Sequence, residues 1–110
     1  MTDALSAAAE PTRRRILQLL AAHPRTVSSI AAEFPVTRSA ISQHLLLLAS
    51  VDLVQADKVG RERIYRVDPT GLRRLQAEID LFWTTELDLL VADARTLHSR
   101  PNQQQNEADR

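Results

Sequence analysis

A short polar stretch in the first half of the chain carries the side chains best suited to hydrogen bonding with a macromolecule. Within two turns of an expected helix it offers a guanidinium, two small hydroxyls and an amide, on Arg38, Ser39, Ser42 and Gln43. In the major groove of DNA a guanidinium pairs with guanine, a side-chain amide pairs with adenine, and hydroxyls bond to bases or phosphates. These residue types at the start of a helix are typical of a surface that contacts base edges.

The two ends of the same stretch add Thr37 and His44. Thr37 is a favourable N-cap, and its hydroxyl and the N–H groups behind it can bind a phosphate. His44 either contacts a phosphate or base or packs at the edge of the helix, and we expect an edge position that faces DNA. Because exposed helix faces are usually polar, this stretch alone leaves base contact and an ordinary solvated face both open.

A second group of cations surrounds Gly60. It consists of Lys58, Arg61 and Arg63, with Glu62 among them. Three cations at the tip of a hairpin can neutralise phosphates or enter a minor groove. The alternative is a solvated turn, whose positive charge Glu62 dilutes. Arg13, Arg14 and Arg15 form a third group, but consecutive helical residues point in different directions, so at most one or two of them can face DNA.

Helical periodicity predicts four helices ahead of the hairpin that carries Gly60. The fourth has an apolar stripe of Ile41, Leu45 and Leu48 that we expect to be buried. Only Pro35 and Val36 separate the third helix from the N-cap of the fourth, which is the spacing of a helix-turn-helix. The expected bounds are Asp3 to Ala9, Pro11 to His23, Thr26 to Phe34, and Thr37 to Ser50.

The pattern then changes to alternation, which predicts two strands. They are Val54 to Lys58 and Arg63 to Val67, joined by a turn over Val59–Glu62 whose glycine supplies a positive φ. The pair Asp68-Pro69 is a cap followed by a first-turn proline, so a last helix begins there. The predicted fold is mainly α with a small β-hairpin (α+β): a winged helix-turn-helix with four helices, a two-stranded wing and a C-terminal helix.

Composition places these elements in one domain of 110 residues, for which we predict residues 1–98, followed by a disordered polar tail over 99–110. The net charge of zero divides unevenly: residues 11–74 hold eleven Arg or Lys and five Asp or Glu, whereas residues 75–110 hold three and seven. The basic middle favours contact with phosphate. The sequence has no secretory signal and no membrane-spanning stretch, so we expect a cytoplasmic protein with no membrane partner.

Three segments resemble the ArsR family of bacterial repressors. They are residues 9–17, 36–45 and 63–69, and residues 81–83 are similar to its SdpR-like branch. The resemblance covers roughly residues 4–95. It implies a homodimer formed mainly by the first and last helices, which binds an inverted-repeat operator in double-stranded DNA as a repressor, often of its own operon. Members are released by a metal or another signal.

Dimerisation also agrees with the last helix, which has more apolar surface than one small domain can cover. Phe82 and Trp83 are adjacent and point about 100° apart, so we expect one to face inward and one to face a partner. The alternative is that both lie in the monomer core. The predicted dimer contacts are Leu5, Ile79, Phe82, Trp83, Leu87 and Leu90.

The sequence departs from the ArsR pattern at Leu46, where many relatives have Lys, and at Asp52, which replaces a common Gly and requires a positive φ. It has no cysteine, and its histidines do not pair with carboxylates at ligand spacing, so we predict no metal site and no cofactor. No inducing ligand follows from the residues. Without a nucleophile–base pair or a phosphate-cradling glycine loop, the protein is not expected to be an enzyme. The alternative to a DNA-binding regulator is a winged-helix protein-interaction module that has lost DNA binding, which the exposed Leu46 favours.

Overall fold

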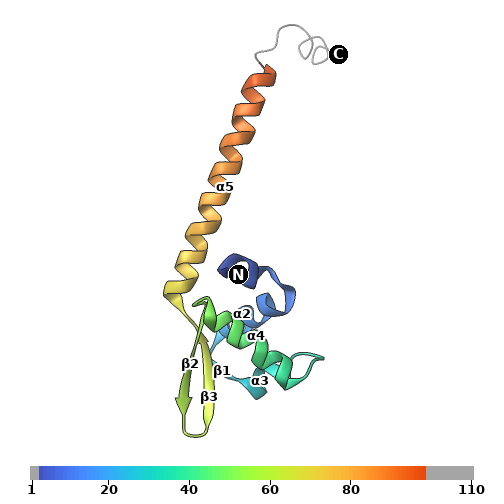
Figure 1. The fold of residues 1–110 in the computed structure, drawn as a ribbon, viewed down its shortest axis with the longest axis vertical. Helices are drawn as coiled ribbons and strands as arrows, with labels where there is room; N and C mark the ends of the chain where they lie inside the picture. Colours follow the sequence, from blue (N-terminus) through green and yellow to red (C-terminus); the bar gives the residue numbers. More distant parts are fainter. Residues whose placement is uncertain (1–2, 99–110) are drawn as a thin grey trace. The chain divides into compact units, whose positions relative to one another are not determined.

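The computed structural model describes residues 3–98, and the predicted tail over 99–110 lies outside them. The chain divides into two units, one ending at Ala77 and one beginning at Glu78, within the last helix. Figure 1 shows the elements in chain order. They are α1 (Ala4–Ala9), α2 (Pro11–Ala22), β1 (Arg25–Thr26), α3 (Val27–Ala31), α4 (Arg38–Ser50), β2 (Val54–Val59), β3 (Glu62–Val67) and α5 (Pro69–His98).

The predicted helix starts are confirmed by their caps. Asp3 accepts a hydrogen bond from the N–H of Ser6 at 2.7 Å, and Thr37 accepts one from the N–H of Ala40 at 3.0 Å. Pro11 occupies the first turn of α2, where its missing N–H costs nothing. A cap satisfies an otherwise unpaired N–H group, which fixes where each helix begins.

The predicted end of the third helix is wrong, because α3 stops at Ala31 rather than at Phe34. The N–H of Glu33 bonds to the carbonyl of Ile30 and that of Phe34 bonds to Ala31, both over three residues instead of four. This tightening turns the chain toward Pro35, so the connection to α4 is longer than expected.

The wing belongs to a three-stranded antiparallel sheet, whereas the sequence predicts only a two-stranded hairpin. The strand order is β1-β3-β2, with Arg25 paired to Tyr65 in β1 and Val59 paired to Glu62 at the end of β2. Gly60 begins the two-residue loop with φ of 63°, as predicted for a residue that must take a left-handed conformation. The third strand ties the base of the wing to the residues just ahead of α3.

The core of the first unit brings together the apolar faces of α2, α3 and α4 with the base of the sheet. The predicted stripe of Ile41, Leu45 and Leu48 is fully buried. The remaining buried apolar residues are Ala7, Ile16, Leu19, Leu20, Ile30, Leu53, Val54, Tyr65 and Leu75. With α4 anchored on this side, its opposite side faces outward.

The start of α5 packs against the turn that follows α4. Asp52 has φ of 62°, which confirms the conformation expected for a residue in place of glycine. Asp68 caps α5 by accepting from the N–H groups of Thr70 at 3.0 Å and Gly71 at 3.3 Å. A Cβ on Gly71 would lie 1.6 Å from the carbonyl oxygen of Asp52, so the two backbones are in direct contact only because residue 71 is glycine.

The Asp68 cap predicts how stability depends on pH. A hydrogen bond from the side chain of Gln55 lowers the pKa of Asp68, and the backbone N–H groups of Gly71 and Thr70 lower it further. A carboxyl group whose pKa is lower in the folded state stabilises the fold at pH values above its ordinary pKa. This stabilisation is lost as the pH falls through the pKa of the folded state. Asp68→Asn keeps a capping oxygen without the charge. We therefore expect its thermal unfolding midpoint to fall less between pH 7 and pH 3 than that of the wild type. An equal loss in both proteins would contradict this role of Asp68.

Candidate nucleic-acid interface

The exposed side of α4 presents a line of side chains opposite its buried stripe. Ser39, Gln43 and Leu46 follow one another at intervals of four and three residues and are all exposed, and Leu46 is exposed by 52%. Ser42 lies beside them and is half-buried. The first two turns therefore present a hydroxyl and an amide where a recognition helix contacts base edges, with an apolar side chain immediately beyond them.

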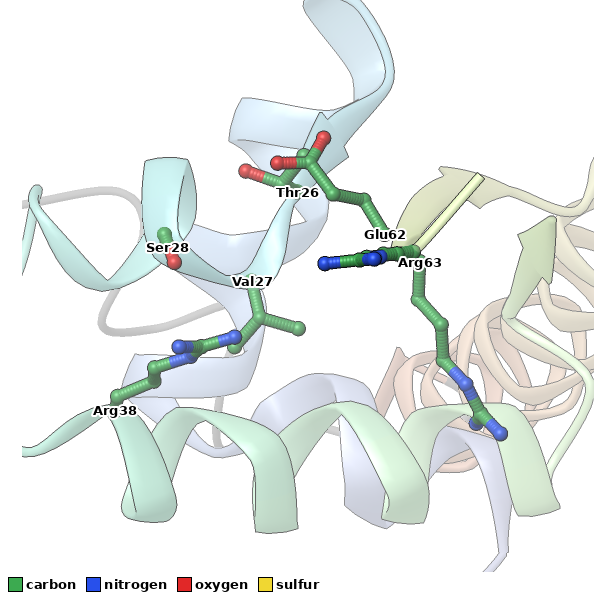
Figure 2. A pocket seen from close by; sticks show the side chains of 7 residues that line it. Thr26, Val27, Ser28, Arg38, Glu62 and Arg63 are labelled. Carbon is green, nitrogen blue, oxygen red and sulfur yellow. The ribbon is translucent and has the colours of Figure 1, made fainter. Parts of the chain in front are cut away.

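A cleft of about 290 Å³ lies between the start of α4 and the tip of the wing. We call it the wing cleft, and its lining residues are Thr26, Val27, Ser28, Arg38, Arg61, Glu62 and Arg63. Figure 2 shows Arg38 extending from α4 on one side of the cleft, with Arg63 and Glu62 of the wing on another. Three arginines and one glutamate line this cleft, and guanidinium groups are favourable partners for an anion such as a phosphate.

The structure thus brings together two groups of residues that the sequence predicts separately. Arg38 from the helix and Arg61 and Arg63 from the wing share one cleft, whereas Lys58 lies outside its lining. Thr26 and Ser28 are additional members that the sequence does not single out. Thr26 is the first residue of the expected third helix, but nothing local indicates that α3 lies beside the wing.

Ion pairing further restricts which cations are available to a phosphate. Arg66 donates to Asp57 at 2.8 Å, and Arg74 lies 3.9 Å from a carboxylate oxygen of Asp52. Within residues 3–98, four of the predicted DNA-contacting cations have no carboxylate at ion-pair distance: Arg38, Lys58, Arg61 and Arg63. Each of these four cations is therefore available to a phosphate.

The prediction that His44 faces DNA stays a prediction, and the structure shows which protein groups its ring contacts. His44 lies on the flank of α4 turned toward α1 and α2, where its Nδ1 is 3.2 Å from Nη1 of Arg13 and 3.9 Å from a carboxylate oxygen of Glu10. The side chain follows Gln43 by about 100° around the helix, which carries it away from the exposed line. His44 therefore belongs to the packing behind the recognition helix.

Thr37 stands at the exposed end of α4. Its Oγ1 accepts the capping hydrogen bond from Ala40, which leaves the hydroxyl hydrogen free to point outward, because a hydroxyl is both donor and acceptor. An N-terminal turn with such a hydroxyl is a favourable place for a phosphate oxygen.

The second unit consists of α5 from Glu78 onward and carries a row of exposed apolar side chains. Phe82, Trp83, Leu87 and Leu90 are between 51% and 62% exposed. Both aromatic rings are exposed in this unit and meet edge to face with centroids 5.5 Å apart. That one ring faces inward and the other faces a partner stays a prediction. In the described chain Ile79 is half-buried, and Leu5 of α1 is 41% exposed.

Among residues 3–98, no three His, Asp or Glu side chains are grouped closely enough to hold a metal ion. None of the described helices combines the length and apolar character needed to cross a membrane.

A helix-turn-helix whose second helix shares an arginine-lined cleft with a β-wing defines the winged-helix class of DNA-binding domain. Residues 10–56 match the model of the arsR family of bacterial regulatory proteins. The chain is 44% identical over 84 residues to the HTH-type transcriptional regulator Rv2034 of Mycobacterium tuberculosis, covering 76% of this chain and 78% of that protein. It therefore belongs to the ArsR family and is a transcriptional regulator, not an enzyme.

Other relatives agree with this assignment. The transcriptional repressor SdpR of Bacillus subtilis is 32% identical, over 66% of this chain and 81% of that protein. A crystal structure described as a possible transcriptional regulator for arsenical resistance is 56% identical with a TM-score of 0.75, over 84% of this chain and 97% of that one. The homodimeric winged helix-turn-helix DNA-binding domain from Mycobacterium bovis is 30% identical with a TM-score of 0.60, over 91% and 84%.

Proposed function

We propose that this protein is a homodimeric repressor that contacts an inverted-repeat operator through α4 and the flanking phosphates through the wing. The observation that carries the proposal is the wing cleft, which Arg38 from the recognition helix lines together with Arg61 and Arg63 from the wing. A DNA backbone that contacts Arg61 and Arg63 on the wing side of this cleft places Arg38, Ser39 and Gln43 of α4 in the adjacent major groove.

Dimerisation is supported by the exposed apolar side chains of α5. Trp83, Leu87 and Leu90 recur at intervals of four and three residues, which places them on one face of the helix. Large exposed apolar and aromatic side chains of this kind are enriched at subunit interfaces. We assign Leu5, Ile79 and Phe82 to the same interface, and the homodimeric relative from Mycobacterium bovis supports this assignment.

A two-fold dimer places two copies of α4 about one helical turn of DNA apart, roughly 34 Å, so the operator is expected to be palindromic. Repression, including repression of its own operon, is proposed because SdpR, one of the relatives, is a transcriptional repressor. A regulator that works on bacterial DNA acts in the cytoplasm.

Separate variants test the two parts of the surface. We expect Arg38→Ala and Gln43→Ala each to lose roughly 1–3 kcal/mol of discrimination between operator and scrambled DNA, because a base contact disappears. Arg61→Ala is expected to weaken binding to all sequences alike and to reduce the salt dependence, because a phosphate contact disappears. Fluorescence anisotropy with both duplexes at several salt concentrations measures these effects.

Arg73→Ala is the matched control. The Arg73 guanidinium donates to Thr70 at the start of α5, and Arg73 does not line the wing cleft. Unchanged discrimination in both recognition-helix variants would refute the assigned base contacts.

One observation favours a second function, that of a protein-interaction module. Leu46 continues the exposed line of Ser39 and Gln43 with an apolar side chain, where a charged residue would be better suited to phosphate. An affinity for DNA that does not change between low and moderate salt would support this function over operator binding.

A further inference from the structure

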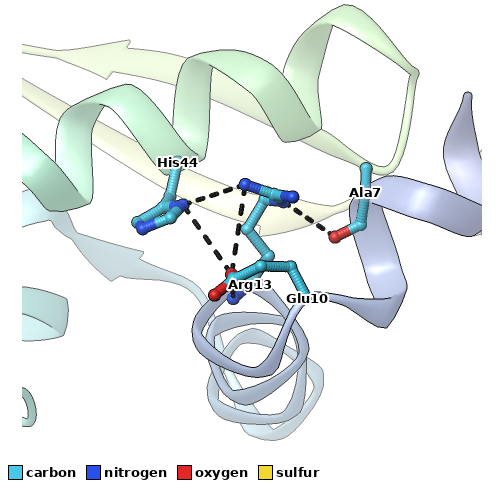
Figure 3. Close-up of polar contacts among 4 residues, drawn as sticks. All are labelled: Ala7, Glu10, Arg13 and His44. Atoms are coloured by element: carbon cyan, nitrogen blue, oxygen red, sulfur yellow. Dashed lines mark hydrogen bonds and ion pairs between the residues drawn. The ribbon is translucent and has the colours of Figure 1, made fainter. Parts of the chain in front are cut away.

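A polar cluster joins the corner between α1 and α2 to the flank of α4 (Figure 3). At its centre, Arg13 donates from Nε to the carbonyl of Ala7 at 2.8 Å, and its Nη1 lies 3.2 Å from Nδ1 of His44. The Arg13 side chain is only 15% exposed. One side chain thus contacts the first helix of the domain and its recognition helix at the same time.

The contact with Ala7 has a local cause. In a continuous helix the carbonyl of residue 7 would accept from the N–H of residue 11, but Pro11 has no N–H group. Nε of Arg13, in the first turn of α2, supplies the missing donor. The direction of the Arg13 side chain is therefore set by the last turn of α1.

Glu10 balances the charge of this side chain. Its carboxylate accepts from the backbone N–H of Arg13 at 2.8 Å and lies 4.0 Å from Nη1 of the same residue. Partial burial opposes ionisation of Glu10, yet hydrogen bonds from the backbone of Arg13 and Thr12, with the nearby side chains of His44 and Arg13, lower its pKa overall. A charged Glu10 keeps the guanidinium beside it.

The hydrogen bond between Arg13 and α4 has a defined direction. A guanidinium can only donate, so in this hydrogen bond Nδ1 of His44 is the acceptor. His44 directly follows Gln43, one of the side chains proposed to contact bases. A shift of His44 against Arg13 therefore moves the base-contacting face of α4.

We propose that Arg13 and His44 form a positioning bridge that holds the recognition helix in register with α1. The inference rests on the proposed function, since α1 carries Leu5 of the proposed dimer interface and α4 carries the proposed base contacts. The bridge joins these two surfaces within one protomer, so the placement of the dimer partner sets the orientation of the recognition helix. His44 acts through Arg13 and does not touch DNA.

The test uses a duplex that the wild-type protein selects from a random-sequence pool, with a scrambled duplex as the non-specific reference. We expect Arg13→Ala and His44→Ala each to lower the ratio of the two affinities roughly tenfold, while non-specific affinity stays unchanged. The double variant is expected to lose about the same tenfold, because either single change already breaks the bridge. Arg14→Ala removes the same charge from an exposed neighbouring position and should keep the ratio.

Two conservative variants of His44 separate positioning from direct contact with DNA. His44→Asn keeps an acceptor close to the position of Nδ1, so it should retain the wild-type ratio, whereas His44→Gln places its amide near Nε2 and should not. The reverse result would show that Nε2 contacts DNA and would overturn the bridge, and so would full discrimination by Arg13→Ala. If Arg13→Ala does not fold, the two His44 variants decide. If the wild type selects no sequence at all, the proposed function fails and the bridge fails with it.

Discussion

Gly71→Ala is expected to destabilise the protein by about 3 kcal/mol or more, although alanine normally favours a helix over glycine by about 1 kcal/mol. The added Cβ would lie 1.6 Å from the carbonyl oxygen of Asp52 and 2.7 Å from its carbon. Both are backbone atoms, so no side chain can rotate away to make room. Either the start of α5 or the turn after α4 must move.

The turn has little freedom to move. The N–H of Asp52 bonds to the carbonyl of Ala49, and that of Leu53 bonds to Leu48. Leu53 is fully buried, and its carbonyl accepts from the N–H of Asp68 at 2.9 Å. Any displacement that relieves the Cβ contact therefore breaks hydrogen bonds or opens the core, which is why we expect the cost to reach the upper end for overpacking.

Gly60→Ala is the matched control for this prediction. Nothing lies within 4 Å of the position of its Cβ, so the substitution only has to place alanine at φ of 63°. That strain costs about 1 to 2 kcal/mol. Urea denaturation at a fixed protein concentration compares the two variants, and a Gly71→Ala protein as stable as Gly60→Ala would show that the contact with Asp52 is not close.

Leu90→Glu is expected to convert the proposed dimer to monomers and to lower operator affinity by at least about 100-fold. The substitution places a carboxylate on the face shared with Trp83 and Leu87, where burial against a partner would leave the charge without solvent. Each monomer then holds only one half-site, so the gain from binding two half-sites together is lost.

The control is Leu81→Glu, which makes the same chemical change at a side chain that is 69% exposed. Leu81 precedes Leu90 by nine residues, which places it about 180° away around the helix. Sedimentation velocity should find Leu81→Glu dimeric and Leu90→Glu monomeric. Two monomeric variants, or two dimeric ones, would refute the assignment of the Trp83, Leu87 and Leu90 face to the interface.

The starts of α1, α4 and α5 follow from the sequence because the signals are local. Asp3, Thr37 and the pair Asp68-Pro69 each act on N–H groups within three residues, so their effect needs no knowledge of the rest of the fold. The buried stripe of α4 and the left-handed conformation of Gly60 depend equally on short spacing. These features together determine the winged helix-turn-helix and the polar face of its recognition helix.

Features that depend on distant pairing are decided only by the tertiary structure. The strand β1 has two residues, too few for any alternation to reveal it, and it exists because Arg25 and Thr26 meet β3. The end of α3 is likewise set by where the chain must turn to reach α4. Length and composition predict neither feature.

The functional surface divides in the same way. The sequence by itself determines that Arg38, Ser39 and Gln43 lie at the start of an exposed helix and that Arg61 and Arg63 lie on a hairpin tip. Only the packing of that helix against the sheet brings these arginines around one cleft, and only the packing of α1 and α2 behind it turns His44 toward Arg13, 31 residues away. Local caps and periodicity fix what a segment is, whereas burial of apolar faces between segments fixes which side chains meet.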